Sequence, residues 1–244
     1  MRYFPPRRLK TAHKMALARL AYRATTLGRG LFGLQDHCQV TRGGLRYDLD
    51  LSEGIDFAIF LLGSFEPSTV GALRRHIKPG ATVLDIGANI GAHTLQMARL
   101  VGSEGRVLSF EPTAFAFAKQ RKNLALNPDI GNRVTALQCF LAADDCEPAP
   151  KSLYASWPLP HEPGVHGKHL GRSMATAGAR IATLDELLVQ RRIERIDLVK
   201  LDVGAPTRPI SGAAACASHG SSGARESGIV RKALSAASGP CAMA

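Results

Sequence analysis

Two carboxylates separated by a glycine-bearing turn carry the clearest chemical signal in the sequence. Asp85 lies near the end of the apolar run 82–86 and precedes Gly87 and Gly91 in the order D-x-G-x-x-x-G, and Glu111 ends a second apolar run. A glycine in such a turn can take a positive φ and lets a ligand approach the backbone. A carboxylate at a strand end can accept hydrogen bonds from ribose hydroxyls. Together these residues predict a site for a nucleoside-containing cofactor.

The spacing of the glycines discriminates between cofactors. The dinucleotide fingerprint is G-x-G-x-x-G, whereas this chain has Asp85 followed by Gly87 and Gly91. A carboxylate at this position can accept a hydrogen bond from an ammonium group but repels a pyrophosphate. The spacing therefore favours the amino-acid part of S-adenosylmethionine over a nicotinamide dinucleotide.

Elements that could position this site follow from hydrophobic periodicity. Helices are expected over 11–27, 55–62, 67–76, 91–100, 113–126 and 183–190, with strands over 45–51, 82–86, 106–110, 134–141 and 196–203. We expect Thr113 and Thr183 to cap the helices that they precede. Buried strands alternating with helices predict an α/β fold with a doubly wound, mostly parallel sheet.

Charge divides the chain into three parts: a basic N-terminal arm at 1–35, a domain at 36–203 and a tail at 204–244. The arm holds eight Lys or Arg residues and no acidic residue, whereas 36–203 is neutral. Because a nucleic-acid partner would require a basic face on the domain itself, none is expected. The arm is interpreted as a solvated helix that packs on the domain. Attachment to an anionic membrane surface is the alternative.

The tail and the segment 145–180 differ from the rest in composition. Ala, Gly, Ser and Pro make up 27 of the 41 residues of 204–244, so we expect disorder there. Five prolines predict a long loop or irregular hairpin over 145–180. Its three histidines lack carboxylate or cysteine partners at ligand spacing, and no metal is expected. Scattered cysteines and the lack of a secretory-signal pattern favour a cytoplasmic location.

The stretch from about Gly44 to Val203 resembles the FkbM family of methyltransferases. The resembling segments include VLDIGANIGAHTL, GRVLSFEPTAFAF, RIATLDELL and IDLVKLDV, in this order. The resemblance implies a Rossmann-like class I methyltransferase fold, S-adenosylmethionine as cofactor, and O-methylation of a small sugar or secondary-metabolite acceptor. It implies that the methionine part of the cofactor binds at Asp85, Gly87, Asn89 and Gly91, the ribose at Glu111, and the adenine near Ala142, Ala143 and Asp144.

A hydroxyl acceptor must lose its proton at or near the transition state, so a base is needed within hydrogen-bond reach. Asp202, at the end of the last expected strand, is the first candidate for this role or for orienting the acceptor. His93, in the first helical turn after Gly91, is the second. Glu66 and Asp56 are weaker candidates. Each of these residues could instead be purely structural.

The sequence departs from the family after Val203, inside the motif that KLDV begins. The family pattern would continue with an acid, a glycine and a glutamate, whereas this chain continues GAPTRPISG. We interpret the tail as the product of a reading-frame change that replaces the last helix and strands of the sheet. The alternatives to an active methyltransferase are a truncated, catalytically inactive cofactor-binding protein and a nicotinamide-dependent oxidoreductase. The oligomeric state is not indicated.

Overall fold

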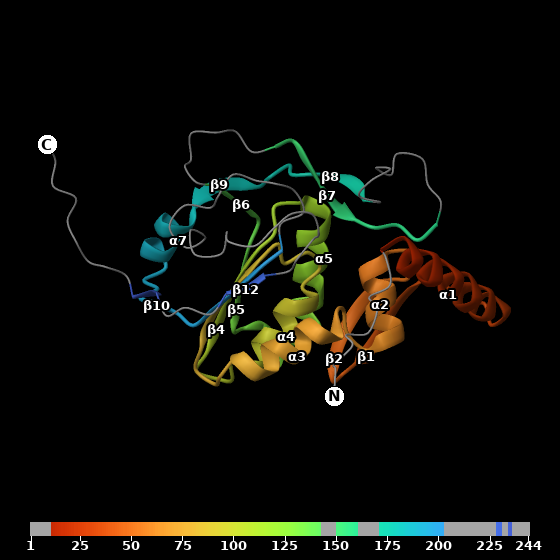
Figure 1. Cartoon of the computed structure of the whole chain (residues 1–244), viewed down its shortest axis with the longest axis horizontal. Helices are drawn as coiled ribbons and strands as arrows, with labels where there is room; N and C mark the ends of the chain where they lie inside the picture. Colours follow the sequence, from red (N-terminus) through yellow and green to blue (C-terminus); the bar gives the residue numbers. More distant parts are fainter. Residues whose placement is uncertain (1–10, 143–149, 161–170, 203–227, 231–233, 236–244) are drawn as a thin grey trace, which may run out of the picture.

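A parallel sheet flanked by helices forms the centre of the protein (Figure 1). The computed structural model describes residues 11–142, 150–160, 171–202, 228–230 and 234–235. The strand order in the central sheet is β12-β11-β3-β4-β5. The four parallel strands are β3 (Thr82–Ile86), β4 (Arg106–Phe110), β5 (Val134–Leu137) and β11 (Leu198–Leu201). They confirm the expected α/β fold with a mostly parallel sheet.

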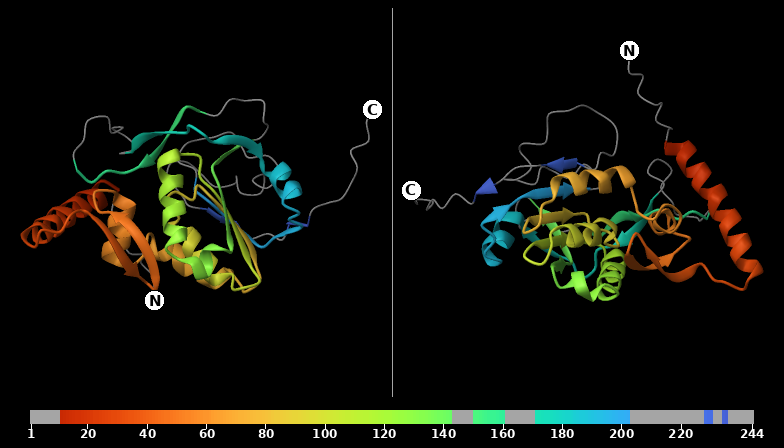
Figure 2. Two further views of the ribbon diagram at one scale, coloured as in Figure 1. Left: turned by 180° about the vertical axis from the view of Figure 1, so that it is seen from behind. Right: turned by 90° about the horizontal axis from the view of Figure 1, so that it is seen from below.

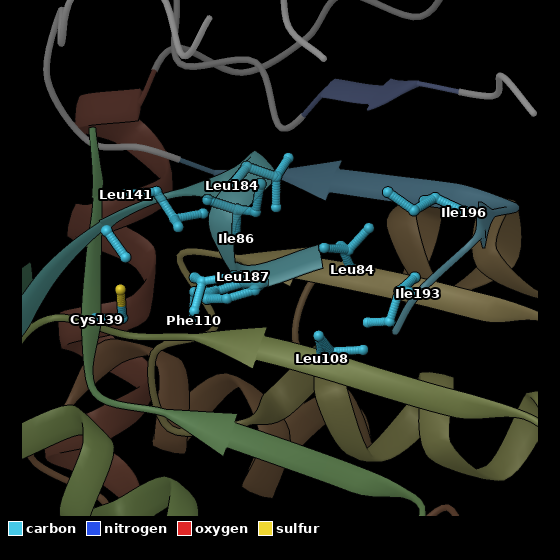
Figure 3. Packing of buried hydrophobic residues seen from close by; sticks show 11 residues of the cluster. Leu84, Ile86, Leu108, Phe110, Cys139, Leu141, Leu184, Leu187, Ile193 and Ile196 are labelled. Carbon is cyan, nitrogen blue, oxygen red and sulfur yellow. The ribbon is translucent and has the colours of Figure 1, made fainter. Parts of the chain in front are cut away.

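Alternating side chains of the central strands face two separate cores. On one face, Leu84, Ile86 and Phe110 pack against Leu184 and Leu187 of α7 (Leu184–Gln190), as Figure 3 shows. On the other face, side chains that include Val83 and Val107 pack against α3 (Pro67–His76) and α4 (Ala92–Leu100). Because both faces are covered, the strands can be apolar throughout, as the sequence indicated.

The helices lie close to their expected positions. Besides α3, α4 and α7, the structure has α2 (Gly54–Leu62), α5 (Ala114–Ala125) and the short α6 (Pro128–Gly131). Thr183 caps α7 in a capping box with Glu186, as expected. Thr113 stands at the N-cap position of α5, but its side chain makes no cap hydrogen bond. Its hydroxyl donates to Glu111 instead, so the expected capping role of Thr113 is wrong.

An N-terminal layer lies beside the central sheet. It contains α1 (Thr11–Leu31) and the hairpin of β1 (His37–Arg42) and β2 (Leu45–Asp50), joined at Gly43 and Gly44. Both glycines have positive φ, which the tight turn requires. Figure 2 shows α1 at the edge of the molecule, along the side of this layer. Within the described residues, no helix combines the length and the apolar character needed to cross a bilayer.

The single strand expected over 134–141 is wrong, because the chain forms two strands there. β5 ends at Leu137, and β6 (Cys139–Ala142) leaves the central sheet to pair in parallel with β9 (Arg180–Thr183). Gln138 lies at the break, where its side-chain amide donates to the carbonyl of Ala177 at 2.8 Å. A polar residue held by the following segment redirects the chain out of the sheet.

The Pro-rich segment contains an irregular hairpin, as expected. β7 (Ser152–Ser156) pairs with β8 (Arg172–Ala175) in antiparallel orientation, with a register shift between Tyr154 and Ser156. Residues 143–149 and 161–170 lie outside the described residues.

Two short strands of the tail belong to the described residues. β12 (Gly228–Val230) pairs antiparallel with β11, and β13 (Leu234–Ser235) pairs antiparallel with β10 (Arg195–Ile196). Apart from these two strands, the tail lies outside the described part of the chain. The expected disorder of the tail therefore stays a prediction. From the sequence, the sheet was expected to lack its last strands beyond β11. Among the described residues, β12 lies at that edge of the sheet and is antiparallel to β11.

Candidate active site at the carboxyl edge of the sheet

The turn between β3 and α4 fits against the end of β11. Gly87 has a φ of 75°, and a Cβ added there would overlap the carbonyl oxygen of Asp202. The backbone N–H groups of Gly87 and Ala88 both donate to the carbonyl of Phe110, at 3.0 Å. This position therefore accepts only glycine, and the turn is fixed between the ends of β4 and β11.

The second half of the turn is held by Gly91 and Asn89. Gly91 has a φ of 85°, and a Cβ on it would lie 3.1 Å from Cγ of Gln120. Asn89 has a φ of 49°, a left-handed conformation that asparagine tolerates better than most residues. Its side-chain amide donates to the carbonyl of Ala155 at 2.8 Å, so the turn is also tied to the β7–β8 hairpin.

Asp85 is completely buried and already faces a cation. Its Oδ1 lies 3.0 Å from Nζ of Lys200, and its Oδ2 accepts from the hydroxyl of Thr94 at 2.7 Å. The two strands place these residues directly opposite each other, because Asp85 and Lys200 are register partners. The carboxylate is therefore paired inside the protein, and its direct contact with a cofactor ammonium group stays a prediction.

Lys200 is a site residue that the sequence reasoning missed. Its Nζ donates to the carbonyl of Gly87 at 3.2 Å and lies 3.9 Å from Oδ2 of Asp202. Burial lowers the pKa of Lys200, but Asp85, Asp202 and Glu66 outweigh that effect and raise it above its usual value. A lysine within the otherwise apolar strand LVKL was the available signal, since a fully buried lysine is rare unless it is paired.

Glu111 lies at the end of β4, as predicted, and is almost fully buried. Its Oε2 accepts from the backbone N–H of Asn89 at 2.8 Å, and its Oε1 accepts from the N–H and the hydroxyl of Thr113. Burial raises the pKa of Glu111, and the hydrogen bonds from Thr113 and Asn89 oppose that rise. The carboxylate thus joins the glycine turn to the start of α5.

The two predicted catalytic residues belong to different local groups. The side chain of Asp202 is 40% exposed beside Lys200. His93 is buried, with its Nε2 3.7 Å from Oε2 of Glu66 and its ring against Phe65. The contact with His93 lowers the pKa of Glu66, against the effect of burial, and the charge of Lys200 lowers it further. Lys200 therefore connects the two groups electrostatically.

Glu66 has an unusual backbone conformation. Its φ of 45° is left-handed, and the next residue is Pro67, which disfavours helical conformations for its predecessor. Such conformations persist where the surrounding structure enforces them, and they are frequent at functional sites. The hydroxyl of Thr69 donates to Oε2 of Glu66 at 3.0 Å and fixes the carboxylate toward His93.

Four other predicted positions remain, and two of them lie outside the described residues. Ala142 ends β6, where it pairs with Thr183. Ala143 and Asp144 lie outside the described residues. Asp56 is buried in α2, where it pairs with Lys119, and burial raises its pKa to about 6 despite that cation. Among the described residues, no cluster of His, Cys, Asp and Glu could hold a metal ion.

The sheet, its two helical layers and the glycine turn at its carboxyl edge define a Rossmann-like α/β protein. Residues 85–203 match the family model described as the methyltransferase FkbM domain. This family match confirms the resemblance seen in the sequence. The match ends at Val203, where the sequence departs from the family pattern.

Solved structures match shorter parts of the chain. An O-methyltransferase from Bacillus cereus in complex with SAH is 27% identical over 29% of this chain and 33% of its own, with a TM-score of 0.27. A SAM-dependent methyltransferase from Aquifex aeolicus is 22% identical over 40% of this chain and 47% of its own, with a TM-score of 0.29. P. horikoshii TYW2 in complex with MeSAdo is 19% identical over 47% of this chain and 46% of its own, with a TM-score of 0.34.

The chain spans less than half of the length of each of these structures. Among curated proteins, no sequence matches the chain.

Proposed function

We propose that the chain is an S-adenosylmethionine-dependent methyltransferase that acts on a hydroxyl group of a carbohydrate-like or secondary-metabolite acceptor. One observation carries the cofactor assignment. The glycine turn at Gly87 lies between two carboxylates, since its N–H bonds to the residue before Glu111 and its α-carbon faces the backbone of Asp202. The acceptor class rests on the family.

The residues of the turn fit this cofactor better than a dinucleotide. Glu111 has about four lone-pair sites on its carboxylate and uses three of them internally, so that Oε2 keeps one for a ribose hydroxyl. A pyrophosphate at the same turn would face the carboxylates of Glu111 and Asp202. A sulfonium cofactor with an ammonium group has the opposite, favourable charge.

Asp85 and Lys200 would act on the cofactor indirectly. Lys200 donates to the carbonyl of Gly87 while it pairs with Asp85, so the pair fixes the height of the turn above the sheet. We assign the ammonium group or the acceptor to Asp202 instead, because the side chain of Asp202 is 40% exposed and that of Asp85 is fully buried.

The bound cofactor would supply an electrophilic methyl group. The chain would hold the acceptor oxygen in line with that group, which provides much of the acceleration of such displacements. The proton of the acceptor hydroxyl would pass to Oδ of Asp202. His93 and Glu66 would then support the wall of the site, because His93 is buried and paired with Glu66.

Calorimetric titration of the purified chain with S-adenosylmethionine, and separately with a nicotinamide dinucleotide, tests the proposal. We expect binding of the former alone, and loss of that binding in Glu111→Ala. Glu104→Ala, at an exposed position, is the matched control and should bind as the wild type does. A folded chain that binds neither compound, or binds only the dinucleotide, would contradict the cofactor assignment.

A second assay separates binding from turnover. Incubation with sugar and secondary-metabolite acceptors should release S-adenosylhomocysteine. Cofactor binding without any release would favour the truncated, inactive alternative.

A further inference from the structure

Helix α1 has one face that is fixed to the domain. Met15, Ala18, Ala21 and Tyr22 pack against the core formed by β2, α2 and α4. The hydroxyl of Tyr22 donates to Oδ2 of Asp36 at 2.6 Å, and its ring meets Phe57 edge-on. The helix is therefore held in a defined rotation about its axis, so that its other face is defined as well.

The outward face of α1 is apolar. Leu17, Leu20, Leu27 and Leu31 recur at helical spacing and are 61–80% exposed, and Phe32 and Leu34 extend the row beyond the helix. A solvated helix normally presents polar residues on its outward face. These six residues, which we call the α1 outer face, form an apolar stripe that nothing in the described structure covers.

The end of α2 carries further exposed apolar side chains. The guanidinium of Arg29 lies 5.6 Å from the ring centre of Phe60, which brings the C-terminal ends of the two helices together. Leu61 and Leu62, the last residues of α2, are both more than half exposed. Exposed apolar surface of this extent on α1 marks an interaction site rather than an ordinary solvated surface.

The charge around the α1 outer face indicates the partner. Residues 1–35 carry eight basic side chains and no acidic one, whereas 36–203 is neutral. Arg23 is exposed at the border of the leucine stripe, one helical turn from both Leu20 and Leu27. Two copies of such a face would repel each other, whereas a surface of anionic lipid headgroups would attract it, with the long basic side chains reaching the headgroups and the leucines entering the acyl boundary.

We propose that the α1 outer face docks the protein on membranes that contain anionic lipid, with α1 lying in the plane of the interface. The inference is independent of the proposed methyl transfer, because it uses no residue of the candidate active site. Apolar burial and charge attraction both contribute to membrane affinity. Burial of leucine side chains provides most of the affinity, and each basic side chain near the surface raises the affinity about fivefold.

Co-sedimentation with vesicles tests the proposal. The full-length chain should bind vesicles of phosphatidylcholine mixed with phosphatidylglycerol, and it should bind vesicles of phosphatidylcholine alone at least about tenfold more weakly, because only the former attract the basic arm. Raising the salt concentration should release the protein, since the attraction is screened. Equal binding to both kinds of vesicle, or no binding to either, would overturn the proposal.

Two variants and one control test which residues are responsible. Leu17→Gln combined with Leu20→Gln and Leu27→Gln should abolish sedimentation, and Arg23→Glu should weaken binding to the mixed vesicles by about tenfold or more. Val189→Gln, at a 79% exposed position on α7, should bind as the wild type does. Because all these side chains are exposed, circular dichroism and thermal unfolding should be unchanged.

Sedimentation equilibrium tests whether a second copy of the chain, rather than a membrane, covers the α1 outer face. A dimer that forms without vesicles and is lost in the triple leucine variant would mean that α1 pairs with a second copy, and would overturn membrane docking. Vesicle binding that survives in the triple variant would overturn it as well.

Discussion

Nζ of Lys200 lies 3.0 Å from Oδ1 of Asp85, and both side chains are buried in the centre of the parallel sheet. The lysine also donates to the carbonyl of Gly87, so one cation joins two strands and the turn that follows them. Since charges are costly to bury without a partner, the pair is required by the fold once either member is present.

Replacing Lys200 by methionine should therefore destabilise the protein by about 3–5 kcal/mol, because it leaves the carboxylate of Asp85 buried without a counter-charge. The double variant with Asp85→Asn should recover part of that loss, since no charge is then left alone. Urea denaturation followed by circular dichroism measures both. Lys151→Met, at an exposed position, should change stability by less than about 0.5 kcal/mol. A Lys200→Met variant as stable as the control would contradict this account.

The glycine turn makes a second prediction. Gly87→Ala combines a left-handed φ with an overlap against the carbonyl of Asp202, whereas Gly80→Ala has a φ of 81° and no atom within 4 Å of the added Cβ. Gly80→Ala is the control, and it should lower the free energy of unfolding only by the conformational strain, about 1–2 kcal/mol. Gly87→Ala should cost clearly more and also abolish cofactor binding. Thermal unfolding and calorimetry measure the two effects, and equal losses in both variants would show that the contact with Asp202 is unimportant.

The sequence predicted the elements of this fold because its signals are local. The runs 82–86 and 106–110 are short, apolar and bounded by turn residues, and both are strands with those bounds. The break at Gln138 was not predictable in the same way, since it depends on a hydrogen bond to Ala177, 39 residues away. Pairing between distant segments leaves no local pattern.

The candidate site was predicted in part for the same reason. Asp85 and Glu111 were identified because they lie at the ends of apolar runs, and both lie at the carboxyl edge of the sheet. The sequence alone could not show that Asp85 is neutralised, because the register that places Lys200 opposite it is a tertiary property. In the sequence, the only sign of a buried lysine is a lysine within an otherwise apolar strand.

Asp56 predicts a pH dependence of stability. Burial raises its pKa from 3.8 to about 6, although Lys119 opposes the rise. The folded chain thus binds the proton more tightly than the unfolded chain, so this contribution is complete below about pH 4 and is lost as the pH rises through about 6. The loss should amount to about 1–3 kcal/mol, since each pKa unit corresponds to 1.36 kcal/mol.

Urea denaturation between these pH values, compared with Asp56→Asn, measures the effect. The asparagine variant should lack this part of the pH dependence while keeping contributions of other groups, including the opposite one from Glu66, whose pKa is lowered. Identical pH profiles for the two proteins would show that Asp56 titrates at its ordinary pKa.

The two catalytic candidates make different kinetic predictions. If Asp202 accepts the proton of the acceptor, Asp202→Asn should lower kcat by about 100-fold or more while cofactor binding is retained, since general bases typically contribute that much. His93→Asn should act through Glu66, because the imidazole is buried and lies 3.7 Å from that carboxylate. Its effect should therefore be smaller on kcat and accompanied by lower stability.

Measurement of kcat against pH for both variants separates the roles. Loss of the acidic limb of the profile in Asp202→Asn, with that limb kept in His93→Asn, is the expected pattern, because only a base that takes the proton must be ionised for turnover. The reverse pattern would move the proton transfer to the pair of His93 and Glu66 and leave Asp202 as a residue that positions Lys200 and the glycine turn.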